Sequence, residues 1–406
     1  MKVLQINTVY GEGSTGSIAK AIHDLCADCR IQCISAHRCV RKGELPLEDS
    51  LSVSSKWDSR LHGQISKFTM FKGIGSVIKT VRFLKQVDRY APDVIHLHNL
   101  HGSYINLPLL FRYIKKHNIP VVWTLHDCWA FTAICSHFTI VGCEKWRAGC
   151  HNCPQRERLS SAPINLSSFV WKAKKKWFTG IPKAVIVTPS HWLEGLARES
   201  FLGTYPIRTI YNGVDLTIFT DTESDFRTEY GIENKKIVLG VAFAWSFEKG
   251  LDVFLELSKR LSKDYQIVLV GTDPEIDRIL PECILSIHRT KDQHELAAIY
   301  TAADVFVNPT REEVLGLVNI EALACSTPVI TFDTGGSPEC VSSSCGIVVP
   351  KNDVDAMERE IIRICTWMPY RKQDCREQAM RFEKKQCLNE YLELYKNISG
   401  MNDGSL

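Results

Sequence analysis

The residue types best suited to bind a phosphorylated ligand lie in the segment EVLGLVNIE. It places Glu313 and Glu321 eight residues apart, with Gly316 between them. The apolar pattern predicts that Glu313 lies in a loop and Glu321 in the helix that follows. Gly316 would let the backbone at that helix N-terminus approach a phosphate, and a carboxylate accepts paired hydrogen bonds from vicinal hydroxyls such as those of ribose. Taken alone, the segment also fits two exposed acids at a helix end.

A glycine-rich turn near the N-terminus is a second candidate for ligand contact. Gly11, Gly13 and Gly16 form a G-x-G-x-x-G sequence between a predicted strand and a predicted helix, which is also the pattern of dinucleotide-binding sites. A site for NAD requires an acidic residue at the end of the next strand, and that strand ends in His37-Arg38. The turn therefore favours contact with a phosphate or sugar and disfavours NAD. A tight strand-to-helix turn without a ligand is the alternative.

Histidines follow two predicted strands of the N-terminal half. HLHNLHG contains His96, His98 and His101 at one strand end, and His126-Asp127 follows PVVWTL at another. The carboxyl ends of parallel strands are where open α/β sheets bind ligands. A single histidine there would usually be a surface residue or a hydrogen-bonded core residue. Two strands ending in the same residue type predict a functional polar cluster, with His126 as its strongest candidate.

Four cysteines fall within nineteen residues of a loop-like segment: Cys135, Cys143, Cys150 and Cys153, with His137 and His151 among them. Four soft ligands ending in C-x-x-C could close a tetrahedral structural zinc site, although the spacing is not that of a standard zinc finger. The alternatives are chance thiols in a chain of 16 cysteines, or a redox pair at Cys150 and Cys153. Such a zinc would be structural only, because a closed four-ligand site leaves no open position for a substrate.

Composition restricts the class of protein. The 406 residues are 45% hydrophobic and 23% charged, and the net charge of +3 is too small to indicate nucleic-acid binding. No run of about 18 apolar residues occurs, and MKVLQINTVYGEG lacks the long apolar region of a secretory signal. We therefore expect a cytoplasmic protein with reduced thiols, two or three domains and no membrane-spanning segment.

Short apolar strands alternate with amphipathic helices along most of the chain, as in parallel βαβ units. The first predicted strands are 2–8, 31–36, 92–99 and 120–125, and a long basic helix covers 60–90. After an irregular stretch the predicted strands are 184–188, 236–241, 265–270, 305–308 and 328–332, with a last helix near 374–397. Two doubly wound sheets fit this order. We expect domains at 1–183 and 184–380, and a C-terminal helix within 381–406 that could pack back on the N-terminal domain.

One longer stretch carries a resemblance to a known family. AADVFVNPTREEVLGLVNIEALACSTPVITFDTGGSPE strongly resembles the signature of the retaining glycosyltransferases of family four. IYNGVDLTIF and the FEKGLDVFLEL segment match the family as well, so the resemblance spans nearly the whole chain. It implies an α/β fold of two facing Rossmann-like domains, called GT-B. The stretch from HDCWAF to GCHNCP resembles a subgroup that builds bacterial exopolysaccharides such as colanic acid.

The resemblance implies roles for single residues. Glu321 would hold the ribose of a nucleotide-sugar donor, Glu313 would hold hydroxyls of the transferred sugar, and Lys249 would neutralise the diphosphate. His126 would contact the sugar from the other domain. The remaining donor contacts would come from four residues: Gly13, Gly16, Gly316 and Leu317. No divalent metal is implied for catalysis, and the leaving phosphate would take the proton of the acceptor hydroxyl.

One position departs from the family pattern. The family usually has an arginine five residues before the lysine, and this chain has Ala244 there. The second half of the phosphate clamp is therefore in doubt. Arg289 and Arg311 are the candidates to replace it, although nothing in their spacing shows that they do.

The resemblance implies an enzyme of hexosyltransferase type. It would move a sugar from a nucleoside-diphosphate sugar to a glycan or lipid-linked acceptor in surface polysaccharide biosynthesis. The rivals are a sugar-nucleotide epimerase on the same fold and a non-catalytic sugar-nucleotide-binding protein, which Ala244 favours. Two stretches combine basic with apolar residues, Lys67–Lys85 and Phe169–Phe178. They predict peripheral contact with the inner membrane surface, with solvated helix faces as the alternative.

Overall fold

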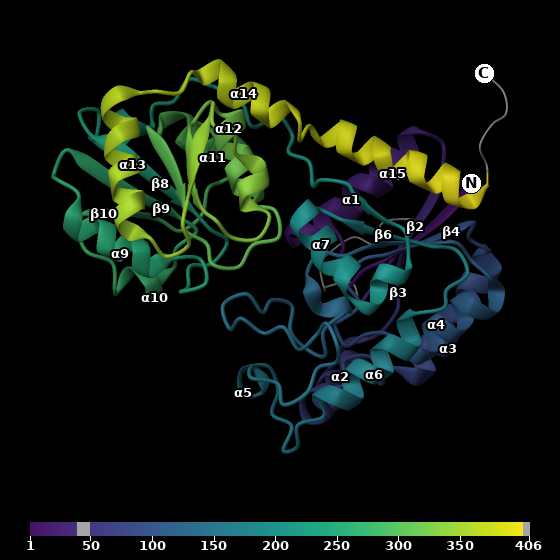
Figure 1. Ribbon diagram of the computed structural model, residues 1–406. Coiled ribbons are helices and arrows are strands. Elements are labelled where there is room, and N and C mark those ends of the chain that lie inside the picture. The colour runs from purple at the N-terminus through teal and green to yellow at the C-terminus, as the bar shows by residue number, and fades with distance from the viewer. Residues whose placement is uncertain (39–48, 401–406) are drawn as a thin grey trace. The chain divides into compact units, whose positions relative to one another are not determined.

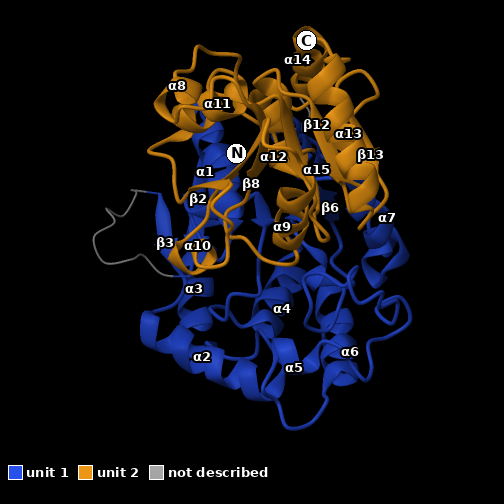
Figure 2. Ribbon diagram, turned by 90° about the vertical axis from the view of Figure 1, so that its left-hand side faces the viewer, with its two compact units in different colours: residues 1–210, 388–406 blue, residues 211–387 orange. Residues whose placement is uncertain are grey.

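The computed structural model describes residues 1–38 and 49–400 and divides the chain into two compact units (Figure 1). Unit 1 consists of residues 1–210 together with the C-terminal segment from Leu388, and unit 2 consists of residues 211–387 (Figure 2). Each unit contains one sheet in which every paired strand is parallel. The predicted α/β class with two Rossmann-like domains is therefore confirmed. No helix in the described part of the chain is long and apolar enough to cross a membrane.

Unit 1 has a seven-stranded sheet whose order reverses between β1 and β4. Its strands are, in spatial order, β3 (Ser50–Ser52), β2 (Gln32–His37), β1 (Lys2–Ile6), β4 (Val94–Leu97), β5 (Val121–Thr124), β6 (Ala184–Thr188) and β7 (Ile207–Thr209). Its helices are α1 (Gly13–Asp28), α2 (Lys56–Thr69), α3 (Val77–Tyr90), α4 (Leu107–His117), α5 (Arg156–Leu159), α6 (Ser167–Phe178), α7 (His191–Glu199) and most of α15 (Lys384–Ser399). Such a reversal opens a crevice at the carboxyl ends of the strands.

Unit 2 has a six-stranded sheet with the same kind of reversal, between β8 and β11. In spatial order its strands are β10 (Ile284–Ile287), β9 (Tyr265–Val270), β8 (Lys236–Val241), β11 (Val305–Asn308), β12 (Val329–Phe332) and β13 (Gly346–Val349). Its helices are α8 (Phe226–Glu229), α9 (Leu251–Arg260), α10 (Pro274–Asp277), α11 (Gln293–Ala302), α12 (Leu317–Ala324), α13 (Val354–Trp367) and α14 (Lys372–Met380). Alternate residues of β8 enter two different cores, Ile237 and Leu239 one of them and Val238 the other. Both faces of the sheet are therefore buried, which explains the nearly continuous apolar strands.

The boundaries between the units differ from those predicted. The expected break at 183/184 is wrong, because Ala184 pairs with Val121 and β6 and β7 extend the first sheet. The irregular stretch before β6 is a long insertion within unit 1, and the units divide at 210/211. At the other end the chain returns to unit 1 at Leu388 rather than at 381. Residues 401–406 of the predicted C-terminal segment lie outside the described residues.

Two helices predicted as continuous are interrupted. The expected helix over 60–90 is α2 and α3, separated by a turn that contains Gly73 and Gly75. Gly73 has a φ of +132°, and a Cβ on Gly75 would lie 2.5 Å from the His62 ring, so this turn requires glycine at both positions. The expected helix over 374–397 is divided between α14, which belongs to unit 2, and α15, which belongs mainly to unit 1.

Helix α15 covers a polar strip on one face of the unit 1 sheet. Its Tyr391 and Tyr395 are buried in the same core cluster as Val3 of β1 and Val122 of β5. The Tyr395 hydroxyl lies 2.6 Å from Nδ1 of the buried His96. Nε2 of the same histidine lies 2.8 Å from Thr124 Oγ1, which donates to the Tyr391 hydroxyl at 3.2 Å. The end of the chain therefore satisfies polar groups that the central strands bury.

We expect Tyr395→Phe to lower the free energy of unfolding of unit 1 by about 1–3 kcal/mol, because buried His96 Nδ1 would lose its partner. Chemical denaturation measures the loss. Tyr113→Phe is the matched control, since its hydroxyl bonds Asp88 at the surface. Equal effects of the two substitutions would contradict the role assigned to Tyr395.

Candidate functional site

In unit 2 the predicted site residues lie in loops that follow three adjacent strands. Lys249 comes after β8, Glu313 after β11, and a turn over 333–337 after β12. These strands are neighbours in the sheet, and the order reverses between β8 and β11. Open α/β sheets bind ligands at this edge and at this point. As predicted, Glu313 lies in a loop and Glu321 lies in α12.

Lys249 and Glu313 form an ion pair in the structure. Lys249 Nζ lies 2.8 Å from Glu313 Oε2, and the two side chains are 38% and 22% exposed. Glu313 Oε1 accepts a hydrogen bond from the Val314 N–H at 3.1 Å. Gly335 packs against the backbone here, because a Cβ on it would lie 1.7 Å from the Glu313 carbonyl oxygen. The lysine and the glutamate are therefore held together at the strand ends.

The N-terminus of α12 has a polar surround with unused hydrogen-bonding capacity. Gly316 precedes the helix with a φ of +89°, no side chain caps it, and its first turn has no acidic residue. A Cβ on Gly316 would meet Asn319 Nδ2 at 3.0 Å and Ser337 Oγ at 3.2 Å. Both atoms are buried and have no hydrogen-bond partner among the residues that the structure describes. Together with the Leu317 N–H of the first turn, they form a cradle of donors for an anion.

The sequence reasoning missed part of this cradle. Asn319 and Ser337 were not predicted as site residues, and neither was Thr334, whose buried Oγ1 also has no partner within the chain. Their signal in the sequence is weak: a polar residue inside an otherwise apolar helix, and polar residues beside the glycines of the GGSPE segment. Their burial becomes visible only when the loops after β11 and β12 pack together.

Glu321 is half-buried on α12 and accepts a hydrogen bond from the Tyr300 hydroxyl at 3.1 Å. Burial raises the pKa of Glu321 to about 7, although the bond from Tyr300 lowers it. Burial, together with the Glu321 charge, also raises the pKa of Tyr300 well above its usual range, so the tyrosine stays a donor. A carboxylate with only one donor has room for the two hydroxyls of a ribose.

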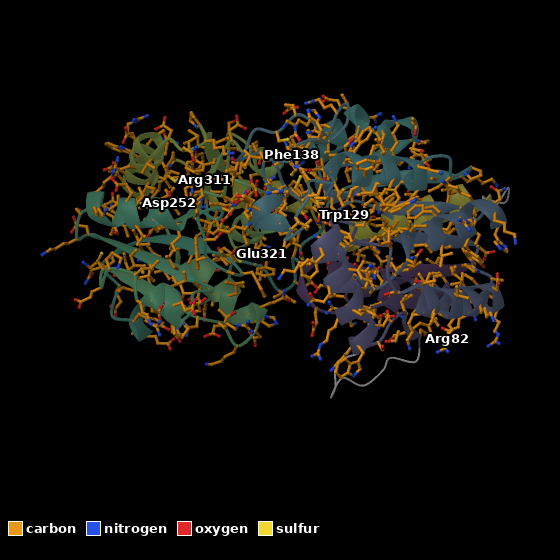
Figure 3. The ribbon with its side chains drawn as sticks, turned by 90° about the horizontal axis from the view of Figure 1, so that it is seen from below. Arg82, Trp129, Phe138, Asp252, Arg311 and Glu321 are labelled. Carbon is orange, nitrogen blue, oxygen red and sulfur yellow. The ribbon has the colours of Figure 1, made fainter. Side chains whose placement is uncertain are left out.

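Arg311 does not replace the missing family arginine. Its side chain is 6% exposed and forms two parallel bonds with Asp252, at 2.7 and 2.8 Å. Figure 3 labels both residues. It also donates to Asn352 Oδ1 and the Phe247 carbonyl. These contacts use its donors to hold the loop after β8 in place. Arg289 is exposed beyond the end of the edge strand β10, and Ala244 is exposed in the loop that carries Lys249.

In unit 1 the glycine-rich turn follows β1, where the sheet order reverses. Gly11 and Gly13 have φ values of +70° and +61°, and a Cβ on Gly16 would press on the Gly11 nitrogen at 3.2 Å. No side chain caps α1, and an added Cβ on Gly13 would meet nothing within 4 Å. The helix N-terminus is therefore open to a ligand. His37, in the place of the acid that NAD requires, is buried with Nε2 3.0 Å from Ser50 Oγ.

A chain of hydrogen bonds fixes the tautomer of His126. Gln5 Nε2 donates to the Ala19 carbonyl at 3.0 Å, so Gln5 Oε1 is the atom that faces His98 Nε2, also at 3.0 Å. His98 therefore carries its proton on Nε2 and accepts at Nδ1, which lies 3.0 Å from His126 Nε2. His126 in turn carries its proton on Nε2, which leaves Nδ1 as an acceptor.

Burial keeps these histidines neutral. It lowers the pKa of His126 to about 4 and the pKa of His98 well below its usual value. The neighbouring Asp127 behaves differently: burial would raise its pKa, but the hydrogen bonds from His101 and the Trp129 N–H lower it to about 2. The predicted polar cluster at the ends of β4 and β5 therefore places an uncharged acceptor next to an ionised carboxylate.

The four cysteines of the insertion in unit 1 are not arranged as ligands of a metal. Within residues 1–38 and 49–400, no group of three or more His, Cys, Asp or Glu side chains could hold an ion. Cys135 and Cys150 are buried, Cys143 and Cys153 are half-buried, and all are free thiols. Burial raises the pKa of Cys135 to about 12 and that of Cys150 to about 11. The structure thus gives the zinc prediction no support, and metal analysis of protein purified without chelator decides it.

Two family models match the chain. One, described as "Glycosyltransferase Family 4", covers residues 50–218, and the other, described as "Glycosyl transferases group 1", covers residues 235–366. The second contains Lys249, Glu313, Gly316 and Glu321. The comparisons give no support to the epimerase alternative.

Curated relatives and solved structures agree with these models. Alpha-maltose-1-phosphate synthase of Mycolicibacterium smegmatis is 26% identical over 50% of this chain and 61% of its own length. Putative colanic acid biosynthesis glycosyl transferase WcaC of Escherichia coli is 24% identical over 76% and 77%. Sucrose-phosphate synthase from Thermosynechococcus elongatus has a TM-score of 0.73 at 19% identity, covering 99% of this chain and 100% of its own. Anabaena Alr3699/HepE in complex with UDP-glucose has a TM-score of 0.67 at 14% identity, covering 98% and 100%.

We expect Glu321→Gln to stabilise the ligand-free protein at pH 8 but not at pH 4. A pKa raised from 4.5 to about 7 contributes stability below pH 4.5, and this is lost as the pH rises through 7. The loss at pH 8 is roughly 3 kcal/mol, which the glutamine would avoid. Unfolding midpoints at the two pH values measure it, with exposed Glu282→Gln as the control. A variant that is destabilised equally at both pH values would disprove the burial of this charge.

Proposed function

The chain belongs to the retaining glycosyltransferases of family four, and from this premise we propose that it moves a sugar from a nucleoside-diphosphate sugar to a glycan or lipid-linked acceptor in surface polysaccharide biosynthesis. One observation carries the donor half of the proposal. Asn319 Nδ2 and Ser337 Oγ are buried, unpaired and directed at Gly316, in front of an uncapped helix. Unpaired buried donors cost roughly 1–3 kcal/mol each, and a diphosphate would supply the missing acceptors.

The comparisons support the same assignment. Alr3699/HepE, which has this fold, was solved with UDP-glucose, and WcaC is named for colanic acid biosynthesis. The half-buried Glu321 would accept from the ribose hydroxyls, and Glu313 would accept from hydroxyls of the sugar.

The proposed mechanism uses charge that is already in place. Lys249 would leave Glu313 for the departing diphosphate, whose negative charge grows as the glycosidic bond breaks, and the α12 N-terminus would face the same oxygens. Groups aimed at developing charge act on the transition state more than on the bound substrate. The neutral His126 would accept a sugar hydroxyl at Nδ1. Its fixed tautomer makes it an acceptor and not a general acid.

Because Ala244 takes the place of the family arginine, more of the proposed phosphate contact falls to Lys249. With Arg311 bound to Asp252, the loop after β8 offers the lysine as its cation for the phosphates. Replacing Ala244 with arginine, the residue usual in the family, would add a second one. The site therefore depends more on Lys249 and on the helix N-terminus than in relatives that have the arginine.

A donor panel tests the proposed function. Thermal shifts with UDP-, GDP-, ADP- and dTDP-sugars identify the nucleotide, since a ligand at one hundred times its dissociation constant stabilises by about 2.7 kcal/mol. The identified donor is then incubated with extracted lipid-linked glycans. Release of the nucleoside diphosphate that depends on acceptor supports a transferase. A changed sugar without acceptor would indicate an epimerase, and binding without any turnover would indicate a binding protein.

We expect Lys249→Ala to lower kcat by well over tenfold while KM changes less, because the lysine would act mainly on the leaving diphosphate. Steady-state kinetics with the identified donor measure both constants. Lys259→Ala on α9, whose side chain is 71% exposed, is the matched control. Activity within about tenfold of the wild type, or 1.4 kcal/mol, would remove Lys249 from the clamp.

Unit 1 also carries a surface suited to membrane contact, which lies on α2 and mostly precedes the predicted stretch Lys67–Lys85. On α2, Trp57, Leu61 and Phe68 are 79%, 64% and 56% exposed. Lys56, Arg60 and Lys67 are exposed on the same helix. Apolar anchors among basic residues fit an anionic lipid surface, where each cation contributes about 1 kcal/mol. We infer that this face of α2 holds the enzyme near its lipid-linked acceptor.

The second predicted stretch is less suited to this role. Lys174 in Phe169–Phe178 is buried, where its ammonium lies 3.5 Å from the centre of the Trp129 ring and donates to the Trp129 and Thr132 carbonyls. Burial lowers its pKa well below the usual value. The lysine therefore anchors α6 to the loop after β5 rather than facing a membrane, which corrects the interpretation of this segment as a uniformly exposed basic face.

We expect the double variant Trp57→Ser, Phe68→Ser to lose at least fivefold in affinity for vesicles containing phosphatidylglycerol, because two anchors are removed. Cosedimentation measures it. Trp367→Ser is the matched control, since Trp367 is 77% exposed on unit 2. Unchanged binding of the double variant, or equal binding to vesicles of phosphatidylcholine alone, would contradict the assignment.

A further inference from the structure

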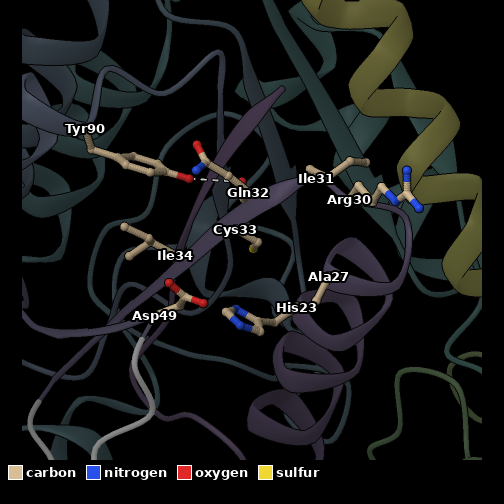
Figure 4. Close-up of a pocket in the computed structure, with 9 residues that line it drawn as sticks. All are labelled: His23, Ala27, Arg30, Ile31, Gln32, Cys33, Ile34, Asp49 and Tyr90. Atoms are coloured by element: carbon tan, nitrogen blue, oxygen red, sulfur yellow. Dashed lines mark hydrogen bonds between the residues drawn. The ribbon is translucent and has the colours of Figure 1, made fainter.

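A cavity of about 400 Å³ lies beside the first residues of β2, away from the strand ends that carry His98 and His126 (Figure 4). The residues that line it come from α1, β2 and the ends of neighbouring elements: His23, Ala27, Arg30, Ile31, Gln32, Cys33, Ile34, Asp49 and Tyr90. Tyr90 closes one side by donating to the Gln32 carbonyl at 2.9 Å. The donor chemistry described above makes no use of this space.

Cys33 is the reactive group in the wall of the cavity. Its thiol is buried and accepts a hydrogen bond from Gln5 Nε2 at 3.4 Å. The hydrogen bond with Cys26 lowers the pKa of Cys33, as do those from His23 and Gln5, and together they outweigh the opposing effect of burial. His23 itself lines the cavity, and its Nδ1 lies 3.1 Å from Ser35 Oγ. Polar donors around a thiolate are the usual setting of a nucleophilic cysteine.

Cys26 supplies a second thiol on the other side. It is buried in α1, in the same core cluster as Cys33. The hydrogen bond to Cys33 and burial raise its pKa, so the two sulfurs differ in character. Cys33 lines the cavity and is the more readily ionised of the two thiols, whereas Cys26 does not line it. Because both cysteines are buried in one cluster, their sulfurs would have to approach only locally to reach the 2.05 Å of a disulfide.

We propose that Cys33 and Cys26 form a thiol–disulfide exchange site and that the cavity admits a low-molecular-weight disulfide. The Cys33 thiolate attacks one sulfur of the reagent, which forms a mixed disulfide and expels the other half as a thiolate. Cys26 then loses its proton to water or to that thiolate and attacks Cys33 Sγ, which breaks the mixed disulfide and releases the second half. In sum two protein thiols are oxidised and one external disulfide is reduced to two thiols.

The exchange site is connected to the histidine chain by a single side chain. Gln5 donates to Cys33 through Nε2 and accepts from His98 through Oε1, and His98 contacts His126. Oxidation of Cys33 changes the sulfur that accepts the hydrogen bond from Gln5 at one end of this chain. The expected consequence is a change in the environment of His126. The thiol–disulfide exchange does not depend on the proposed function. Only an effect of oxidation on glycosyltransferase activity would rest on it.

The test uses 2-hydroxyethyl disulfide on the full-length protein, followed by peptide mass mapping after blocking free thiols. We expect a Cys26–Cys33 disulfide in the wild type. In Cys26→Ala we expect the mixed disulfide to persist on Cys33, and in Cys33→Ala we expect Cys26 to stay reduced. Cys29→Ala and Cys283→Ala are matched controls, since both thiols are exposed. Mixed disulfides on Cys29 and Cys283, with Cys33 unmodified in the folded protein, would overturn the proposal.

A second readout separates this proposal from the proposed function. The imidazole nitrogen resonances of His98 and His126 should shift when the wild type is oxidised and should not shift in Cys33→Ala. A disulfide without any shift would leave the exchange site in place and disprove the connection through Gln5. A wild type that forms the Cys26–Cys33 disulfide but transfers no sugar would support the exchange proposal and contradict the proposed function.

Discussion

Unit 2 depends on polar groups that are buried without a partner at the start of α12. Asn319 Nδ2 and Ser337 Oγ lie close to the position that a Cβ on Gly316 would take, at 3.0 and 3.2 Å from it. The helix has neither a side-chain cap nor an acidic residue in its first turn. Unpaired buried donors destabilise a protein, and so does the buried carboxylate of Glu321. Because the fold retains the unpaired donors and the buried carboxylate, the carboxyl edge of the sheet is suited to a ligand with phosphate oxygens and vicinal hydroxyls.

Contacts among the surrounding loops hold the carboxyl edge of the unit 2 sheet in place. Gly335 lies against the Glu313 carbonyl, and Arg311 in the loop after β11 bonds Asp252 of α9 and the Phe247 carbonyl of the loop after β8. Gly250, with a φ of +77°, lies against the Pro309 carbonyl just after Lys249. Backbone packing and the side chain of Arg311 thus fix three strand-end loops, while Asn319 Nδ2 and Ser337 Oγ have no hydrogen-bond partner among the described residues. Preorganisation of this kind lets charges act on a transition state without first moving into place.

Unit 1 also buries polar groups, but side chains of the same unit supply their hydrogen-bond partners. Its sheet buries polar side chains in the middle of one face, and α15 and Gln5 satisfy them one after another. Because the Ala19 carbonyl can only accept, the direction of every bond from Gln5 to His126 follows. A buried glutamine of β1 therefore sets which nitrogen of His126 is an acceptor. The same glutamine donates a hydrogen bond to Cys33, so a chemical change at Cys33 would act on the hydrogen bonds that lead to His126.

The sequence predicted the parts of this structure that local patterns encode. The segment from Glu313 to Glu321 shows its loop, its glycine and its helix directly, and β8, β9, β11 and β12 are plain apolar runs. Asn319 and Ser337 were not predicted because they stand out only by a buried polar atom without a hydrogen-bond partner among the described residues. Only the packed structure reveals that feature. The break at 183/184 was misplaced because a long insertion looks like a linker.

One further error has the same origin. Lys174 sits among lysines in the sequence, yet the fold turns it inward onto the Trp129 ring. The zinc site at the four cysteines stays a prediction, and within residues 1–38 and 49–400 no group of ligands for a metal ion is found. Short spacing along the chain gives proximity but not direction.

Proton release on donor binding tests the central claim most directly. Glu321 is about half protonated at pH 7 in the free protein, and ribose hydroxyls favour its ionised form. Titration calorimetry in two buffers of different ionisation enthalpy should therefore show about half a proton more released by the wild type than by Glu321→Gln, which also corrects for titration of the phosphate. Tight binding with equal proton release by both proteins would contradict the account.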